Sequence, residues 1–369
     1  MVSKERLTQR FLEMIKIYSP SKGEKEMADW IERYLTERGI SFQSDHAGEA
    51  YGGNGRNIVA CIPGTKKGMP LGFAAHMDQI EPCEGVKAVQ EGDIIRTDGT
   101  TTLGGDDKSG ITAILEAVED ILETGAEHRD IYLVFTCSEE ISMMGTKHMD
   151  LGMLPCRDLV IADATGDTGV IAYKAPGMEA IRVVFHGKKA HAGIEPEKGI
   201  NAVKVAAEAI SHMHIGRIDS ETTSNIGRIE GGSATNIVTD EVAFTAEIRS
   251  RSMEKLADEV AHMRGCCEEA AKASGASFEF IHEPAYPALS LDVESQLVKE
   301  TVSAMEAEGV KPDLMVIGGG SDANVLAGHG YRSVILGLGM RNVHTVEEEL
   351  DINEVWKAAK VMRRMMDGE

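Results

Sequence analysis

Short apolar runs that alternate with helical patterns constrain the fold of this chain more than any other feature. Residues 71–75, 131–137 and 159–162 are compact apolar runs of the kind that form buried strands. Residues 108–122 carry their apolar side chains at helical spacing instead. Strands and helices that alternate in this way are typical of a mostly parallel sheet with helices on both faces, so we expect an α/β fold.

A different pattern begins after Gly177. Residues 178–283 predict the order strand, helix, strand, strand, helix, strand, which is that of a ferredoxin-like β-α-β-β-α-β unit. The earlier alternation returns after this segment. We therefore expect a discontinuous α/β domain of residues 1–177 and 284–369, with residues 178–283 inserted as a small independent domain.

Two capping patterns predict where helices begin. Ser21 and Glu24 have the spacing of a capping box, in which each side chain bonds to the other residue's backbone. Asp351 and Glu354 have the same spacing ahead of the last helical pattern. We expect one helix to start near each pair.

The charge balance disfavours several kinds of partner. The chain has 38 Lys and Arg residues against 60 Asp and Glu residues, which gives a formal net charge of −22. Such a surface repels the phosphates of nucleic acids and of anionic lipids, so we expect neither partner. No apolar run approaches the ~20 residues of a transmembrane helix, and the N-terminus lacks the apolar segment of a signal peptide. These features predict a cytoplasmic protein.

Acidic residues and histidines follow the ends of the expected strands. The main candidates, in chain order, are His76, Asp106, Glu140, Asp163 and His344. Ligands of open α/β sheets gather beyond the carboxyl ends of the strands, so we expect these side chains to lie together. Two imidazoles and several carboxylates suit two divalent ions such as Zn²⁺. A neighbouring glutamate left unligated would be placed to act as a general base.

Each candidate taken alone also has a structural interpretation. Asp106 could cap the helix that follows it, and Asp163 could stabilise a turn. A lone histidine such as His344 is more often a hydrogen-bonded structural residue than a ligand. The turn at 318–324 fits either a tight strand–helix connection or a helix N-terminus that receives an anionic group of a substrate. Under the second interpretation, Gly319 and Ser321 would contact the substrate.

Five motifs occur in a fixed order along the chain: AAHMDQI, LGGDDKSG, TCSEEISMMG, IADATGD and NVHTVEEEL. Together they resemble the peptidase T group of the co-catalytic zinc exopeptidase family, over essentially the whole chain. The same family includes carboxypeptidase G, bacterial dipeptidases, aminoacylases and the succinyl-diaminopimelate desuccinylase. The resemblance implies a zinc exopeptidase-like catalytic domain and an inserted lid domain through which two copies form a homodimer.

The resemblance also implies the metal ligands. His76, Asp106 and Asp163 match the ligands of one zinc ion. Asp106, Glu140 and His344 match those of a second ion, so that Asp106 would bridge the two. The expected cofactor is therefore a pair of Zn²⁺ ions, with Mn²⁺ or Co²⁺ as alternatives. The family often has a cis peptide bond after the residue that matches Asp106.

Further roles are implied for residues around the ions. Glu139 matches the general base, and Asp78 matches the carboxylate that orients His76. His191, in the motif KKAHAGIEPEKG, matches a lid histidine that stabilises the oxyanion and reaches the partner subunit's site in dimeric relatives. Lid positions that contact substrate are matched by Asn236 and Arg249.

These roles predict a di-zinc exopeptidase that hydrolyses short peptides, as a tripeptide aminopeptidase does. An N-acyl-amino-acid deacylase or another amidohydrolase of the family is the first alternative, and a metal-binding scaffold without catalysis is the second. Asp163 favours the peptidase, because acylases and carboxypeptidases of the family tend to carry Glu there. Glu139 disfavours the scaffold, which needs no base. The segment between Asp78 and Asp106 is shorter than in peptidase T itself, which leaves the preferred peptide length open.

Overall fold

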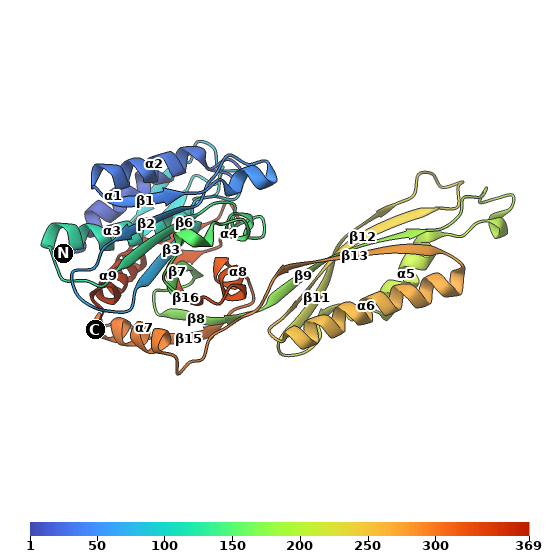
Figure 1. Ribbon diagram of the computed structural model, residues 1–369. Helices are drawn as coiled ribbons and strands as arrows, with labels where there is room; N and C mark the ends of the chain where they lie inside the picture. The colour runs from blue at the N-terminus through green and yellow to red at the C-terminus, as the bar shows by residue number, and fades with distance from the viewer. Residues whose placement is uncertain (369) are drawn as a thin grey trace. The chain divides into compact units, whose positions relative to one another are not determined.

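The computed structural model describes residues 1–368 and divides into two compact units (Figure 1). Unit 1 comprises Met1–Lys174, Ser290–Ile317 and the C-terminal segment from Ser321. Unit 2 comprises Ala175–Leu289 together with Gly318–Gly320, a short segment that the sequence did not assign to it.

Unit 1 is built on a mixed sheet. Its central strands run parallel in the order β6 (Ile131–Thr136), β3 (Leu71–His76), β7 (Asp158–Thr165) and β16 (Arg332–Arg341). Antiparallel strands extend this centre at its two sides, namely β2 (Ile58–Ile62) and β1 (Ser41–Ser44) beyond β6, and β17 (Glu349–Asp351), β5 (Ile94–Thr97) and β4 (Ala88–Glu91) beyond β16. The remaining strands are β8 (Val170–Ala175), β14 (Leu289–Ser290) and β15 (Asp313–Val316). The expected α/β fold is confirmed, with its parallel strands at the centre of the sheet.

Helices cover both faces of this sheet (Figure 1). α3 (Gly105–Thr124) lies on β3 and β7, and α9 (Ile352–Asp367) lies beside it on β16. α8 (Asp322–Gly328) contacts β16 and α4 (Met144–Lys147). The other helices of the unit are α1 (Lys4–Met14), α2 (Lys25–Glu37), α7 (Gln296–Ala307) and the short η1 (Ala47–Tyr51) and η2 (Leu151–Met153).

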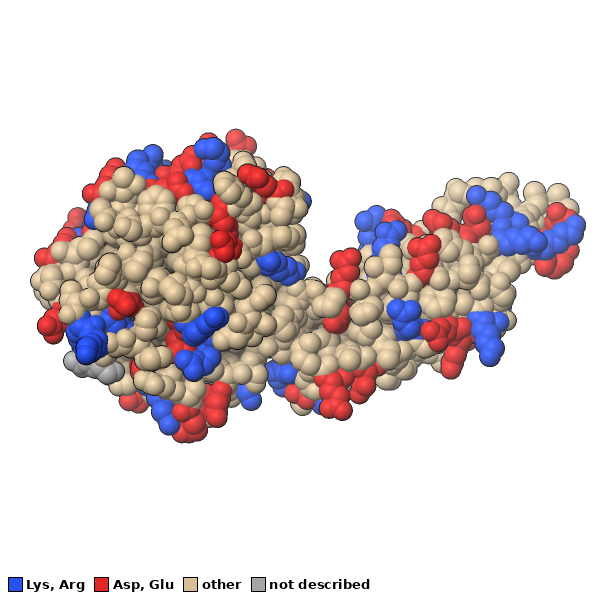
Figure 2. Space-filling view, in the orientation of Figure 1, with Lys and Arg blue, Asp and Glu red and all other residues tan. Residues whose placement is uncertain are grey.

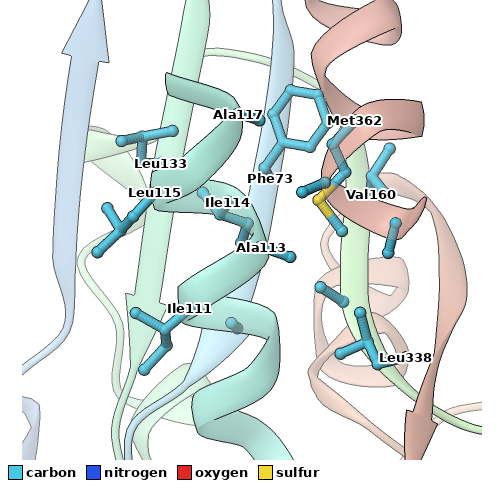
Figure 3. Close-up of a cluster of buried hydrophobic side chains, with 14 of the residues drawn as sticks. Phe73, Ile111, Ala113, Ile114, Leu115, Ala117, Leu133, Val160, Leu338 and Met362 are labelled. Atoms are coloured by element: carbon cyan, nitrogen blue, oxygen red, sulfur yellow. The ribbon is translucent and has the colours of Figure 1, made fainter. Parts of the chain in front are cut away.

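The core of unit 1 forms where α3 and α9 meet the sheet (Figure 3). Ile111, Ile114 and Leu115, which recur at helical spacing in the sequence, are fully buried on α3. They share one hydrophobic cluster with Phe73 of β3 and Met362 of α9. Burial of each of these large apolar side chains stabilises the fold by about 1.5–3 kcal/mol. This packing fixes the carboxyl ends of the central strands, and the candidate ligands lie at or just after these ends.

Unit 2 is a five-stranded antiparallel sheet with two helices packed against it. Its strands, in spatial order, are β10 (Gly216–Arg217), β11 (Thr222–Gly231), β12 (Glu241–Ser250), β9 (Gly177–His186) and β13 (Ser277–Tyr286). The helices are α5 (Ala202–His212) and α6 (Met253–Ser274), with the short η3 (Pro196–Lys198) before α5. Alternate buried residues of β12, such as Phe244 and Ile248, form the core with both helices. The ferredoxin-like order is confirmed, and β10 is a two-residue addition at its edge.

One predicted helix cap is present and the other is not. The Asp351 carboxylate accepts a hydrogen bond from the Asn353 N–H at 3.0 Å, at the start of α9. Glu24, in contrast, precedes α2 without capping it, and the Ser21 hydroxyl donates to Asp78 instead. The capping box predicted at Ser21 and Glu24 is therefore wrong, because both side chains bond to residues far away in the sequence.

No helix among residues 1–368 is long and apolar enough to cross a membrane. Figure 2 shows acidic side chains spread over both units and interspersed with basic ones on the face in view.

Candidate metal centre

The candidate ligands lie at the carboxyl ends of the central strands. His76 ends β3, Asp163 lies near the end of β7, and Glu140 follows β6. Asp106 precedes the regular part of α3 with non-helical dihedral angles, and the peptide bond to the next residue is cis, as the resemblance implied. His344 follows β16 with a φ of 65°, a conformation that non-glycine residues rarely adopt outside constrained sites.

The Asp106 carboxylate lies between two histidines. Its Oδ1 is 2.9 Å from His76 Nε2, and its Oδ2 is 3.2 Å from His344 Nε2. On the first side, Asp163 Oδ1 lies 3.7 Å from His76 Nε2. On the second side, Glu140 Oε2 lies 2.9 Å from His344 Nε2. The structure thus brings the five predicted ligands together, with Asp106 in the position that a bridging carboxylate requires.

Negative charge exceeds positive charge at this cluster. Burial, together with the charge of Asp106, raises the pKa of Asp163 well above its usual range. Burial also raises the pKa of Glu140, although its hydrogen bond to His344 opposes the shift. Hydrogen bonds to Asp106 and Glu140 raise the pKa of His344 to about 10. Burial therefore disfavours the charged forms of Asp163 and Glu140, and bound divalent ions would favour them.

An unpartnered buried atom supports the same conclusion. Glu140 Oε1 is buried and has no hydrogen-bond partner among the described residues. Such an atom costs about 1–3 kcal/mol unless something binds it. Its neighbours are imidazole nitrogens and carboxylate oxygens, which are the donors that Zn²⁺ and Mn²⁺ accept. The residues present therefore fit a divalent metal centre.

Within residues 1–368, two overlapping groups of this centre could each hold an ion. His76, Asp106 and Glu140 form one group, and His76, Asp107 and Asp163 form the other, with ligand atoms within 4.8 Å of one another. The second group contains Asp107, which was not among the predicted ligands. Its Oδ2 accepts from the His76 N–H and its Oδ1 from the Gly110 N–H, both at 3.1 Å. Because both of its oxygens bind backbone, Asp106 is the better placed bridge.

Asp78 organises both sides of the cluster from a fully buried position. Its Oδ1 lies 3.3 Å from His76 Nδ1, the ring nitrogen that faces away from Asp106. Its two oxygens also accept from the N–H groups of Glu139 at 2.9 Å and Glu140 at 3.2 Å. The Ser21 hydroxyl donates to its Oδ2 at 2.7 Å. One carboxylate therefore orients the His76 ring and also the backbone that presents both glutamates.

Glu139 is buried beside these ligands. Burial, with the charge of Asp163, raises the pKa of its carboxyl group well above the usual range. The preceding Ser138 has a φ of 53°, so the turn that presents Glu139 adopts a conformation unusual for a non-glycine residue. A carboxyl group with a raised pKa can accept and then hold a proton near neutral pH, as a general base must.

Two further buried carboxylates support the site, and the sequence analysis gave them no role. Glu348 accepts from the N–H groups of Leu103, Gly104 and Asp106 at 2.7–3.0 Å, and so holds the loop that presents Asp106. Asp322 accepts from the hydroxyl groups of two threonines, Thr136 and Thr146, both at 2.5 Å. Asp322 follows no central strand, and Glu348 lies in an acidic run seven residues beyond the end of β16, so the position of neither acid marked it as part of the site.

The remaining candidates lie elsewhere. His191 and Asn236 belong to unit 2, where the backbones of 190–192 and 236–238 pair, with the Ala192 N–H donating to the Asn236 carbonyl at 3.0 Å. Arg249, on β12, binds Glu247 through two hydrogen bonds and reaches the Gly318 carbonyl at 3.4 Å. The roles of these three residues toward the substrate stay predictions.

The turn at 318–324 forms a strand–helix connection. Ser321 is buried, and its hydroxyl accepts from the Ala323 N–H at 3.2 Å, while Asn324 Oδ1 accepts from the Ser321 N–H at 3.0 Å. This reciprocal capping of α8 favours the structural interpretation of the turn. Contact of Gly319 or Ser321 with substrate stays a prediction.

Comparison with known proteins identifies the family of the chain. Residues 173–274 match the peptidase dimerisation domain of the M20 family. The chain is 40% identical over 362 residues to the uncharacterized protein YqjE of Bacillus subtilis, with 98% of both chains covered. It is 36% identical to the aminopeptidase PepT of Bacillus cereus, with a TM-score of 0.94 over 99% of this chain and 98% of that one. It is 33% identical to a tripeptidase of Staphylococcus aureus, with a TM-score of 0.96 over 100% and 98% of the two chains. The chain therefore belongs to the M20 family of metallopeptidases, in its peptidase T-like group.

Proposed function

We propose that this peptidase T-like metallopeptidase removes the amino-terminal residue from short peptides at a site with two Zn²⁺ ions. The observation that carries the proposal is the Asp106 carboxylate, whose two oxygens face two different histidines at 2.9 and 3.2 Å. The names of two similar solved structures, an aminopeptidase and a tripeptidase, support the substrate class.

In this proposal, the ligands divide into two sets that share Asp106. His76, Asp106 and Asp163 hold one ion, and Asp106, Glu140 and His344 hold the other. Zn²⁺ is the ion we expect, with Mn²⁺ or Co²⁺ as replacements, because the donors are two imidazoles and three carboxylates. When bound, the ions polarise the peptide carbonyl and lower the pKa of a water molecule.

Glu139 performs the proton transfers. Its carboxylate takes a proton from the attacking water and delivers it to the nitrogen of the leaving group. Its buried position beside Asp163 raises its pKa, which suits a group that must hold a proton between the two steps. Asp78 fixes the backbone position of Glu139 by accepting a hydrogen bond from the Glu139 N–H at 2.9 Å.

Unit 2 serves as lid and dimer interface in the proposal. The match of residues 173–274 to a peptidase dimerisation domain supports a homodimer. His191 would stabilise the oxyanion of the transition state in the partner subunit's site, and Asn236 and Arg249 would contact substrate.

A peptide panel tests the substrate class. The metal-loaded enzyme is incubated with di-, tri- and tetrapeptides, each with a free and with an acetylated amino terminus, and the products are identified by mass spectrometry. We expect release of the first residue from the free peptides and none from the acetylated ones. Hydrolysis of N-acyl amino acids alone would replace the proposal with a deacylase. Absence of any hydrolysis with both ions bound would replace it with a metal-binding scaffold.

A further inference from the structure

We propose that unit 2 carries a separate Zn²⁺ site formed by His214, Glu259 and His262. This site lies outside the catalytic cluster and does not depend on the proposed function. Among residues 1–368, these three side chains of unit 2 are close enough together to hold one metal ion, with one ligand atom of each within 4.8 Å of the others.

The sequence and packing of unit 2 bring the three side chains together. Glu259 and His262 are three residues apart on α6, so both project from the same face of the helix. His214 comes from the segment between α5 and β10, and its Nδ1 lies 3.1 Å from Glu259 Oε2. The two imidazole rings stack, with centroids 4.1 Å apart and planes 13° from parallel. A zinc ion lies in the plane of each imidazole that binds it, so the exposed His214 ring must turn out of this stack to share an ion with His262.

The buried carboxylate is the observation that points to a ligand. The Glu259 residue is only 7% exposed, and its Oε1 is buried with no hydrogen-bond partner among the described residues. No ion pair joins it to a lysine or arginine within residues 1–368, and its ionic contact is with His214. A buried carboxylate that lacks a full partner is costly unless a cation binds it.

Both histidines are held in place by groups other than the carboxylate. The Ser224 hydroxyl donates to the backbone carbonyl of His214 and so fixes this residue against β11. His262 Nε2 lies 3.2 Å from the His212 carbonyl, within hydrogen-bond distance. A ring held by a backbone carbonyl through one nitrogen is the usual arrangement for a histidine that binds a metal through the other.

The donors select the class of ion. Two imidazoles and one carboxylate suit Zn²⁺ and disfavour Ca²⁺ and Mg²⁺, which prefer oxygen ligands. A tetrahedral Zn²⁺ ion held by these three side chains would keep its fourth position for water. The ion would tie the segment after α5 to the middle of α6, and so stabilise the helical layer of unit 2.

A comparison of metal content between variants tests the site. Full-length wild type and His214→Ala are stripped with a chelator, reloaded at micromolar free Zn²⁺, desalted and analysed for zinc per chain. The His214 side chain is 55% exposed, so its removal leaves the core intact. His212→Ala is the matched control, because this neighbouring exposed histidine lies outside the group.

We expect His214→Ala to bind one zinc ion fewer than wild type and His212→Ala to bind the same number as wild type. Peptide hydrolysis should be the same in all three proteins. Loss of one ligand should weaken zinc binding at this site by about 100-fold or more, since even changes behind the ligands cost 10–100-fold. Equal zinc content and equal affinity in His214→Ala and wild type would overturn the proposal. The difference of one ion does not depend on how many ions the catalytic centre holds, so the two proposals fail separately.

Discussion

Glu139 and Glu140 are adjacent, identical in charge and both largely buried, yet the structure gives them different tasks. Glu140 Oε2 contacts His344 at 2.9 Å and its Oε1 is unpartnered, which suits a metal ligand. Glu139 is buried beside Asp163 with a raised pKa, which suits a base. An explanation from bulk charge alone predicts similar effects of removing either charge. The matched variants Glu139→Gln and Glu140→Gln therefore separate the two accounts.

The expected magnitudes follow from these positions. Glu139→Gln should keep both ions and nearly the same KM, while kcat falls by the ~10²–10⁴-fold typical of general acid–base catalysis, or about 2.7–5.4 kcal/mol of transition-state stabilisation. Glu140→Gln should lose one ion, because a direct ligand is lost. Metal analysis and steady-state kinetics on the same preparations measure both quantities. Full turnover by Glu139→Gln would refute the mechanism, and loss of an ion from Glu139→Gln alone would reverse the assignment.

Three further predictions concern stability, positioning and assembly. The melting temperature of the metal-free protein should fall as the pH rises from 5 to 8, because the raised pKa values of Glu139 and Asp163 mean that the folded state binds protons which the unfolded state has released. The melting temperature of the metal-loaded protein should change less. A metal-free melting temperature that rises with pH would contradict this prediction. Asp78→Asn should lower metal affinity by about 10–100-fold and also lower kcat, since Asp78 holds His76 and the glutamate backbone; unchanged affinity in a zinc titration would contradict this role. Sedimentation should show a dimer. If His191 acts in the partner subunit's site, an equal mixture of Glu139→Gln and His191→Ala subunits should regain about a quarter of wild-type activity after subunit exchange, because half of the dimers are mixed and each mixed dimer has one intact site. No recovery of activity in verified mixed dimers would exclude that role.

Much of the catalytic site could be predicted because it obeys a positional rule. Chemistry in open α/β sheets gathers beyond the strand ends, and His76, Glu140 and Asp163 follow strands that the apolar runs identify. The same rule grouped Asp106 and His344 with them, although each taken alone also has a structural interpretation. The resemblance to a known family was needed to divide the five ligands between two ions.

The supporting residues could not be predicted in this way, because their partners are distant in the sequence. Ser21 lies 57 residues from Asp78, and its spacing to Glu24 imitates a capping box. The Glu24 carboxylate accepts from the Ser138 hydroxyl, 114 residues away. Glu348 lies in an acidic run that suggests an exposed loop, but it binds the backbone of Leu103, 245 residues away. Only the folded chain brings such groups together.

The flanks of the large sheet escaped prediction for a different reason. β4 is exposed along its whole length, so no apolar pattern marks it. β17 has three residues, too few for an alternation to be visible. The His214 group has the same difficulty, since it depends on how the segment after α5 packs against α6.

Anomalous diffraction from crystals of the zinc-loaded enzyme tests the central claim most directly, because it locates the ions without relying on activity. At the Asp106 cluster, the account predicts two zinc peaks ~3.5–4 Å apart, one on each side of the Asp106 carboxylate. His76 and Asp163 should bind the first ion, and Glu140 and His344 the second. A single ion beside Asp106 at saturating zinc, or two ions that do not share this carboxylate, would contradict the account.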